Sequence, residues 1–273
     1  MSESVKKRAY AKINLFLRVG GRKEGYHEIE TLMQSVDLFD EIILAKTEDG
    51  SVTSDFPGDN SVKVLNLLSR EFQLGGMRLS VRKNIPIGGG LGGSTADAAA
   101  AAIACAELWG LDKDRVKEIA APLFSDIAFQ MTGGSAIARG YGERLTKIPD
   151  LPSFPLLLAF PEGEVSTKEA YSLSDSTKKG KGNLSALTDA LRCGERAQEY
   201  YLNDLLLPAT MLNDKIAPLL ERMRDERALL TGMTGSGSTL FSLYTEEESA
   251  RKMASTLTAP TLITRTISPF GRK

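Results

Sequence analysis

The sequence is poor in the residues that bind zinc or form disulfides. It has two cysteines, Cys105 and Cys193, and one histidine, His27, in 273 residues. The cysteines are far apart and form no CxxC pair, which excludes a zinc site of ordinary ligand spacing and a disulfide scaffold. We expect each cysteine to act as a small apolar side chain within the fold.

Long apolar runs are also missing. The longest unbroken run of hydrophobic-class residues, Ala98–Ala106, has nine residues, whereas a membrane-spanning helix needs about 20. Near the N-terminus, Lys12 and Asn14 interrupt any apolar core that a signal peptide would require. The sequence therefore predicts a cytoplasmic protein with no membrane segment.

Charge of one sign is not in excess. The 34 Lys and Arg residues balance 35 Asp and Glu residues, which gives a net charge of −1. This balance argues against a general nucleic-acid binder and against a polybasic membrane surface. A chain of this length forms one large or two modest domains, and its composition is that of a soluble globular protein.

Apolar periodicity predicts an α+β fold. Strands are expected over residues 8–19, 41–46, 77–83, 156–160 and 262–267, as a pair with a tight turn within 135–145, and beside a glycine turn within 229–244. Helices are expected over residues 60–72, 113–121, 185–191, 197–206, 216–227 and 246–257, and from the glycine-rich residues 88–93 to near Gly110. Residues 174–183 are expected to form a surface loop.

Three prolines lie close together near the middle of the chain. Pro149, Pro152 and Pro155 follow one another closely, and such a segment is typical of a domain boundary. We therefore predict an N-terminal domain over residues 1–152 and a C-terminal domain over residues 153–273.

The glycines near position 90 allow several interpretations. Gly88, Gly90 and Gly93 satisfy the dinucleotide-binding pattern GxGxxG. However, Pro86 stands where a strand would run into the loop, and a second helix rather than a strand is expected after the first. A P-loop would need a lysine where Ser94 stands. Both of these nucleotide folds are therefore disfavoured.

The same loop has the physical properties of a phosphate site. Five of the six residues 88–93 are glycine, so the backbone can come close to a ligand. A helix N-terminus follows, and its free N–H groups and dipole favour an anion. The hydroxyls of Ser94 and Thr95 can add hydrogen bonds or reach a phosphate-bound Mg²⁺. From these properties alone, the alternative is a flexible turn with a Ser/Thr cap.

Three separated motifs then point to one superfamily. They are residues 11–17 (AKINLFL), 86–97 (PIGGGLGGSTAD) and 233–239 (MTGSGST). Together they resemble the three motifs of the GHMP small-molecule kinases, a superfamily that includes galactokinase, homoserine kinase and mevalonate kinase. The resemblance implies a two-domain GHMP kinase fold with the active site in the interdomain cleft, and ATP and Mg²⁺ as cofactors.

Shorter matches narrow the resemblance. They are residues 25–27 (GYH), 31–34 (TLMQ), 140–143 (GYGE), 165–171 (VSTKEAY) and 203–205 (NDL). These are similar to the branch that phosphorylates the 2-hydroxyl of 4-diphosphocytidyl-2-C-methyl-D-erythritol in the non-mevalonate isoprenoid pathway. The alternatives are another GHMP kinase, acting on mevalonate, homoserine or a sugar, or a degenerate nucleotide-binding paralogue. Either a monomer or a homodimer is compatible with the sequence.

The resemblance implies two catalytic residues. Asp126 would be the base that takes the hydroxyl proton, and Lys12 would lie beside it, where a cation keeps a carboxylate ionised and stabilises transferred charge. Because side chains alternate along a strand, Asn14 shares a face with Lys12 and is placed to hydrogen-bond the sugar alcohol. The family usually reads Gly-Ala-Asp-Val-Pro here, whereas this sequence has Phe124-Ser-Asp-Ile-Ala128. That difference keeps the degenerate paralogue open.

The resemblance also implies the binding residues. Tyr26 and Tyr171 would stack on the two faces of the cytosine, and His27 would read its edge. The substrate would further contact residues of the third motif: Thr234, Gly235, Ser236 and Gly237. ATP would contact Pro86, Gly88, Gly89, Gly90, Leu91, Gly92, Gly93, Ser94, Thr95, Asn60 and Lys83. No residue is assigned as a ligand of Mg²⁺.

Overall fold

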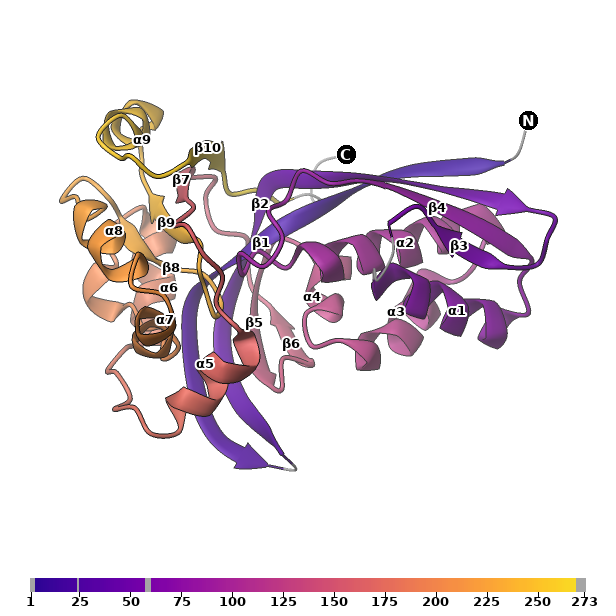
Figure 1. The fold of residues 1–273 in the computed structure, drawn as a ribbon, viewed down its shortest axis with the longest axis horizontal. Coiled ribbons are helices and arrows are strands. Elements are labelled where there is room, and N and C mark those ends of the chain that lie inside the picture. The colour runs from indigo at the N-terminus through magenta and orange to yellow at the C-terminus, as the bar shows by residue number, and fades with distance from the viewer. Residues whose placement is uncertain (1–2, 24, 57–59, 269–273) are drawn as a thin grey trace. The chain divides into compact units, whose positions relative to one another are not determined.

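The computed structural model describes residues 3–23, 25–56 and 60–268 (Figure 1). It divides into two compact units, each built from several segments. Unit 1 contains residues 1–11, 38–87 and 92–133, and unit 2 contains residues 12–37, 88–91 and 134–273. Two long strands, β1 (Ser4–Lys23) and β2 (Tyr26–Thr47), contribute residues to both units. The boundary between residues 152 and 153 stays a prediction.

Unit 1 combines a small sheet with helices. The second half of β2 pairs antiparallel with β4 (Gly76–Arg82), and β4 pairs in parallel with β3 (Val52–Ser54). The helices gather along one side of these strands (Figure 1). They are α1 (Asn60–Phe72), α2 (Gly93–Trp109), α3 (Lys113–Ala120), the 3₁₀ turn η1 (Ala121–Leu123) and α4 (Ile127–Thr132).

The alanine-rich helix α2 is buried on nearly all sides. Alanine has the best helix propensity, and its small side chain lets α1 and α4 pack directly against α2. Glycines in the left-handed region stand at both ends, Gly92 with φ of 71° and Gly110 with φ of 65°. A residue with a Cβ would be strained in either place. The helix that follows the glycine-rich residues 88–93 is therefore enclosed within unit 1.

Unit 2 contains two groups of strands. The first half of β2 pairs antiparallel with β5 (Ser135–Gly140), which pairs with β6 (Arg144–Lys147). A second, antiparallel sheet has the order β10-β7-β9-β8. Its strands are β7 (Pro155–Ala159), β8 (Leu230–Met233), β9 (Leu240–Leu243) and β10 (Thr261–Arg265).

Unit 2 also contains several short helices. They are α5 (Thr167–Ser174), α6 (Leu184–Cys193), the 3₁₀ turn η2 (Gln198–Tyr200), α7 (Leu206–Leu212), α8 (Ile216–Arg222) and α9 (Glu247–Ala254). Leu157 and Leu240 of the sheet meet Ala209, Ile216 and Met253 of the helices in one buried cluster. This core supports the strand ends from which the third motif emerges.

The α+β class and most predicted elements are confirmed. Three predictions are wrong or incomplete. Residues 197–205 do not form an α-helix, because η2 is followed by a short extended segment and a turn, and α7 begins only at Leu206. The helix predicted to reach residue 227 ends at Arg222, and β2 is far longer than the predicted 41–46. Helices α4, α5 and α7 were not predicted. Among the described helices, none is long and apolar enough to cross a membrane.

The two cysteines differ in environment. Cys105 is buried within α2, and burial raises the pKa of its thiol to about 12, so its prediction as an apolar filler is confirmed. Cys193 is exposed at the end of α6, so the same prediction is wrong there. A helix end at the surface offers no core for that side chain to fill.

Candidate active site

Segments from the three motifs meet within unit 2. The backbone N–H of Lys12 donates to the carbonyl of Leu91 at 3.0 Å. The N–H of Asn14 donates to the hydroxyl of Thr234 at 3.0 Å, and that hydroxyl donates to the carbonyl of Gly90 at 3.1 Å. The first strand, the glycine loop and the third motif, predicted to form one site, are therefore joined by direct hydrogen bonds.

Gly90 lies where the glycine loop of residues 88–93 comes close to a second glycine loop, residues 234–237 of the third motif. Its φ is 76°, and a Cβ built on it would lie 2.5 Å from the carbonyl oxygen of Thr234 and 3.0 Å from that of Gly237. Two backbone segments can approach this closely only if the residue between them has no side chain. Gly90 is thus required by the packing of these two backbone segments.

Lys12 and Asn14 share one strand face, as predicted. The Lys12 ammonium donates to Asn14 Oδ1 at 2.6 Å, and Asn14 Nδ2 donates to the hydroxyl of Thr31 at 2.8 Å. Lys12 is 5% exposed and Asn14 is 4% exposed. A buried ammonium is stable only with polar partners, so this chain of hydrogen bonds fixes the direction of both side chains. The contribution of Thr31 was not foreseen from the sequence.

Hydrogen bonds from Asn203 and from Thr167 of α5 hold the third motif in place. Asn203 donates to the carbonyls of Met233 and Gly235, at 2.8 and 3.0 Å. Ser236 and Thr167 share a hydrogen bond of 2.8 Å between their hydroxyls. Asn203 and Thr167 belong to two of the shorter sequence matches, but their support of this loop could not be read from spacing.

The residues predicted to bind a pyrimidine form two aromatic ring contacts in unit 2, one between His27 and Tyr171 and one between Tyr26 and Tyr141. The rings of His27 and Tyr171 are stacked, with centroids 5.3 Å apart and an interplanar angle of 30°. Tyr26 instead meets Tyr141 edge to face, with centroids 5.7 Å apart. Tyr26 is 70% exposed, so its ring presents a large face to solvent. The pairing of Tyr26 with Tyr171 around a base stays a prediction.

Asp175 fixes the orientation of His27. The imidazole Nε2 lies 2.6 Å from Asp175 Oδ1, and Arg22 pairs with the other carboxylate oxygen at 2.9 Å. The hydrogen bond with His27, followed by the charges of Arg22 and Lys179, lowers the pKa of Asp175. The carboxylate therefore accepts from Nε2–H of the imidazole. Asp175 was not identified from the sequence, because it lies in the polar loop after α5 where no pattern marks it.

The glycine loop runs into the first turn of α2, which belongs to unit 1. The Thr95 hydroxyl and the side-chain amide of Gln130 both donate to the carbonyl of Gly92, at 2.9 and 3.3 Å. Ser94 is exposed at this helix start. The predicted geometry, a helix opening directly from the glycine loop, is confirmed by the start of α2 at Gly93.

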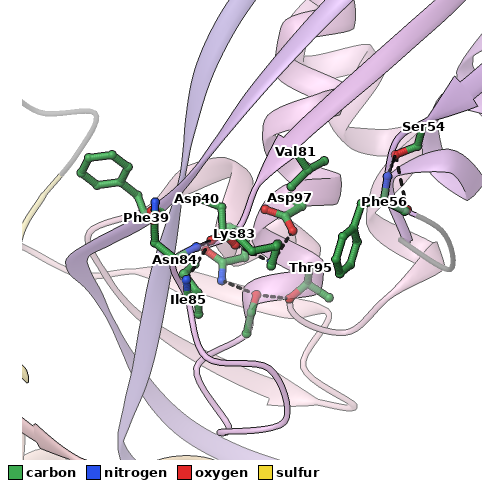
Figure 2. A network of polar contacts seen from close by, with 12 residues as sticks. Phe39, Asp40, Ser54, Phe56, Val81, Lys83, Asn84, Ile85, Thr95 and Asp97 are labelled. Carbon is green, nitrogen blue, oxygen red and sulfur yellow. Dashed lines mark hydrogen bonds and ion pairs between the residues drawn. The ribbon is translucent and has the colours of Figure 1, made fainter. Parts of the chain in front are cut away.

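Lys83 lies in a buried network of unit 1, just before the loop (Figure 2). Its ammonium bridges Asp40 Oδ2 at 2.5 Å and Asp97 Oδ2 at 2.6 Å. Burial acts to lower the pKa of Lys83, but the hydrogen bonds and charges of the two aspartates outweigh it and raise that pKa. The Phe56 ring lies beside the ammonium, at 5.8 Å to its centroid. Neither aspartate was identified from the sequence.

Asp126 stands at the N-cap of α4, and its side chain makes no capping hydrogen bond to that helix. The altered residues around it keep a regular backbone. Phe124 has φ of −149° and ψ of 138°, an extended conformation that needs no glycine. Ala128 lies in the first helical turn, where a proline would remove no intrahelical hydrogen bond. The departures from the family pattern are therefore compatible with the same local structure.

The remaining predicted residues are spread over both units. Asn60 opens α1, and Pro86 is half-buried at the start of the loop. Beyond it, in unit 2, the carboxylate of Glu164 lies against Gly88, with its Cδ 3.4 Å from where a Cβ of that glycine would be. Within the described residues, no group of three His, Cys, Asp or Glu side chains could hold a metal ion.

Comparison with known proteins identifies the family of this chain. Residues 60–137 match the GHMP kinases N terminal domain, and residues 184–260 match the GHMP kinases C terminal family. The chain is similar to 4-diphosphocytidyl-2-C-methyl-D-erythritol kinase of Leifsonia xyli subsp. xyli, at 35% identity over 94% of this chain and 93% of the relative. The enzyme of that name from Pelotomaculum thermopropionicum is 36% identical, over 96% and 97% of the two chains.

The chain belongs to the 4-diphosphocytidyl-2-C-methyl-D-erythritol kinase family. A crystal structure of 4-(cytidine 5'-diphospho)-2C-methyl-D-erythritol kinase is similar throughout, with a TM-score of 0.83 and 30% identity over 96% of this chain and 99% of that one. A homoserine kinase from Cytophaga hutchinsonii has a TM-score of 0.73 at 19% identity, covering 98% of this chain and 96% of that one. The latter likeness concerns the fold alone, which members of this family share with the wider GHMP superfamily.

Proposed function

We propose that this protein transfers the γ-phosphoryl group of ATP to the 2-hydroxyl of 4-diphosphocytidyl-2-C-methyl-D-erythritol, in the supply of isoprenoid precursors. The observation that carries the proposal is the likeness to kinases of this name at 35–36% identity over more than nine tenths of the chain. The mevalonate and homoserine kinases of similar fold are only 12–19% identical. A mevalonate, homoserine or sugar kinase is thus the weaker alternative.

The glycine loop is the proposed site of the ATP phosphates. Phosphoryl transfer requires chiefly that the enzyme position its substrates and stabilise negative charge. Backbone N–H groups of a glycine loop and the N-terminus of a long helix supply both without an ionisable side chain. Gly88–Gly93 and the start of α2 have this geometry. Ser94, Thr95, Asn60 and Lys83 stay predicted ATP contacts.

Asp126 is the proposed general base and Lys12 the cation that stabilises charge on the transferring group. A carboxylate that accepts the hydroxyl proton makes the oxygen a better nucleophile at the moment of attack. Lys12 is already fixed by Asn14, so its charge needs no reorganisation during the reaction. Asn14, buried on the same strand face, is the proposed partner of the acceptor's hydroxyl groups.

We propose that ATP binds together with Mg²⁺. Mg²⁺ usually binds through one or two carboxylates together with substrate phosphates and water. Glu164, whose carboxylate lies against Gly88 of the glycine loop, fits this requirement as a single protein ligand. When bound, the ion would neutralise charge on the phosphates, which would otherwise be repelled by that carboxylate.

The cytoplasmic location, the absence of nucleic-acid partners and the oligomeric state stay predictions.

Recognition of the cytidine end is assigned to the aromatic residues of unit 2. The exposed ring of Tyr26, the ring of Tyr171 and the imidazole of His27 are all within this region. Stacking a pyrimidine on aromatic rings buries its faces at a small cost in conformational entropy. Because Asp175 accepts from Nε2–H, a neutral His27 offers Nδ1 as an acceptor, which suits the amino group of cytosine.

Replacement of Tyr26 or Tyr171 by Ala is expected to weaken binding of a cytidine diphosphate analogue. Stacking on a base contributes about 1–3 kcal/mol, or roughly five- to 150-fold in Kd. The Tyr→Phe variants should be mild, since stacking needs the ring and not the hydroxyl. The double Ala variant should be less than additive, because a base that loses one ring can already shift. Calorimetric titration with the analogue and with ATP measures both affinities.

Tyr200→Ala is the matched control, since this tyrosine lies in η2 of the same unit and outside the aromatic contacts of the site. It should leave both affinities unchanged, and ATP affinity should hold in every variant. Unchanged affinity for the cytidine analogue in the Tyr26/Tyr171 double Ala variant would remove these residues from substrate recognition and leave a GHMP kinase with another acceptor.

A further inference from the structure

Asp40 makes several hydrogen bonds to one short segment of chain. It lies on β2 in unit 1 and is fully buried, with 0% of its surface exposed. Its Oδ1 accepts the backbone N–H groups of Asn84 and Ile85, at 2.5 and 2.8 Å, and its Oδ2 accepts the ammonium of Lys83. Three consecutive residues that lead into the glycine loop are thus held by one carboxylate (Figure 2).

Lys83 extends this attachment to the other end of the loop. Its ammonium also binds Asp97, at 2.6 Å, and Asp97 lies near the start of α2 and is only 1% exposed. The chain between the two attachments, residues 86–96, contains the whole glycine loop. The chain that enters the loop is therefore fixed directly to Asp40 of β2, and the chain that leaves it is linked to the same carboxylate through the Lys83 ammonium.

The charges make this attachment rigid. Two buried carboxylates would repel each other if no cation lay between them, and Lys83 supplies that cation. Charge-assisted hydrogen bonds are shorter and stronger than neutral ones. Buried ion pairs of this kind are poor sources of net stability, because desolvation offsets their attraction, but breaking one leaves a buried charge without compensation. Their presence here is better explained by a need to hold the chain in one place.

We propose that Asp40 is a positioning residue for ATP: with Lys83 and Asp97 it clamps both ends of the glycine loop, so that the loop's N–H groups are directed at the phosphates before ATP binds. The inference rests on the proposed function, which assigns this loop to ATP. It adds that the affinity for ATP depends on two carboxylates that do not themselves contact the nucleotide.

The test uses Asp40→Asn and Asp97→Asn in the full chain. Each variant keeps the size of the side chain but removes the charge that attracts Lys83. A displacement of about 1 Å in a positioned group can cost on the order of 10²-fold, so we expect the Kd and KM for ATP to rise about 10- to 100-fold. The KM for the acceptor should change less than about threefold. Hydrogen exchange of the loop amides, residues 87–93, should become faster in both variants.

Glu107→Gln is the matched control. Glu107 lies on the same helix α2, makes a surface ion pair with Lys7 and is 47% exposed, so the variant removes the same charge without touching the clamp. It should bind ATP as the wild type does. Because Asp40 and Asp97 act through one ammonium, the double variant should raise the Kd less than the product of the two single effects.

The measurements separate the possible failures. If Asp40→Asn does not fold, Asp97→Asn tests the clamp from the other end of the loop. Folded variants that have lowered melting temperatures but wild-type Kd for ATP and wild-type loop exchange would overturn the proposal, since the network would then serve stability alone. A wild-type protein that does not bind ATP would instead overturn the proposed function.

Discussion

Asp126→Asn is expected to lower kcat by about 10²- to 10⁴-fold, the usual contribution of a positioned general base. The amide is nearly isosteric with the carboxylate but cannot accept the hydroxyl proton. The side chain of Asp126 makes no capping hydrogen bond to α4, so the helix should persist and the Kd for ATP should stay within about threefold. Steady-state ADP release gives kcat, and calorimetry gives the Kd.

Asp114→Asn controls for the loss of one negative charge from unit 1. Asp114 is an exposed residue in the first turn of α3, and its replacement should leave kcat at the wild-type value. An Asp126→Asn variant that keeps more than a tenth of wild-type kcat would remove this residue from proton transfer and favour a mechanism without a general base.

Gly90→Ala is expected to raise the Kd for ATP by about tenfold or more. The new Cβ would lie 2.5 Å from the carbonyl oxygen of Thr234, so the two glycine loops must separate. Overpacking of this kind costs about 1–3 kcal/mol, and the φ of 76° adds about 1–2 kcal/mol for a residue with a Cβ. ATP titration of the folded variant, checked by its circular dichroism, measures the effect.

Gly194→Ala separates backbone strain from the steric clash. Gly194 has a similar φ of 72°, but a Cβ there would meet nothing within 4 Å. This variant should lose stability in thermal unfolding and keep wild-type affinity for ATP. Equal ATP affinities in both variants would show that contact between the glycine loops does not shape the nucleotide site.

Elements with a clear local signal were predictable from the sequence. Helix α2 ends before Gly110, where the left-handed φ favours glycine, and α1 has the predicted bounds of residues 60–72. Strand β2 was harder, because residues 31–36 are buried on both faces and include three polar side chains. These are satisfied by distant partners, as when Thr31 donates to the carbonyl of Phe16. An alternation of apolar and polar residues cannot reveal such a strand.

The helix predicted over residues 197–206 does not form because contacts with distant parts of the chain hold this segment in another conformation. Its apolar residues are spaced as in a helix, but the chain is held extended by backbone hydrogen bonds between Leu17 and Leu202 and between Leu17 and Asp204. The buried Tyr201 hydroxyl adds hydrogen bonds with the backbone of Met233. Long-range contacts of this kind outweigh a weak helical preference.

The residues of the candidate site that belong to a sequence motif could be predicted, and those outside any motif could not. The glycine loops and the Lys12–Asn14 face follow from residue types and strand alternation. Asp40 and Asp175 do not, because each acts through a partner far away in the sequence: Asp40 through Lys83, 43 residues on, and Asp175 through His27, 148 residues before it. A single carboxylate in a strand or loop has no local pattern that distinguishes it from a solvated charge.

The choice of acceptor is tested most directly by ADP release from ATP and Mg²⁺ with four acceptors offered separately. These are 4-diphosphocytidyl-2-C-methyl-D-erythritol, mevalonate, homoserine and galactose. Rapid ADP release with the cytidine-linked acceptor alone, lost in Asp126→Asn, is the expected result. Turnover of one of the other three in its place would contradict the proposed function, and binding of ATP without turnover of any acceptor would identify a nucleotide-binding protein that is not a kinase.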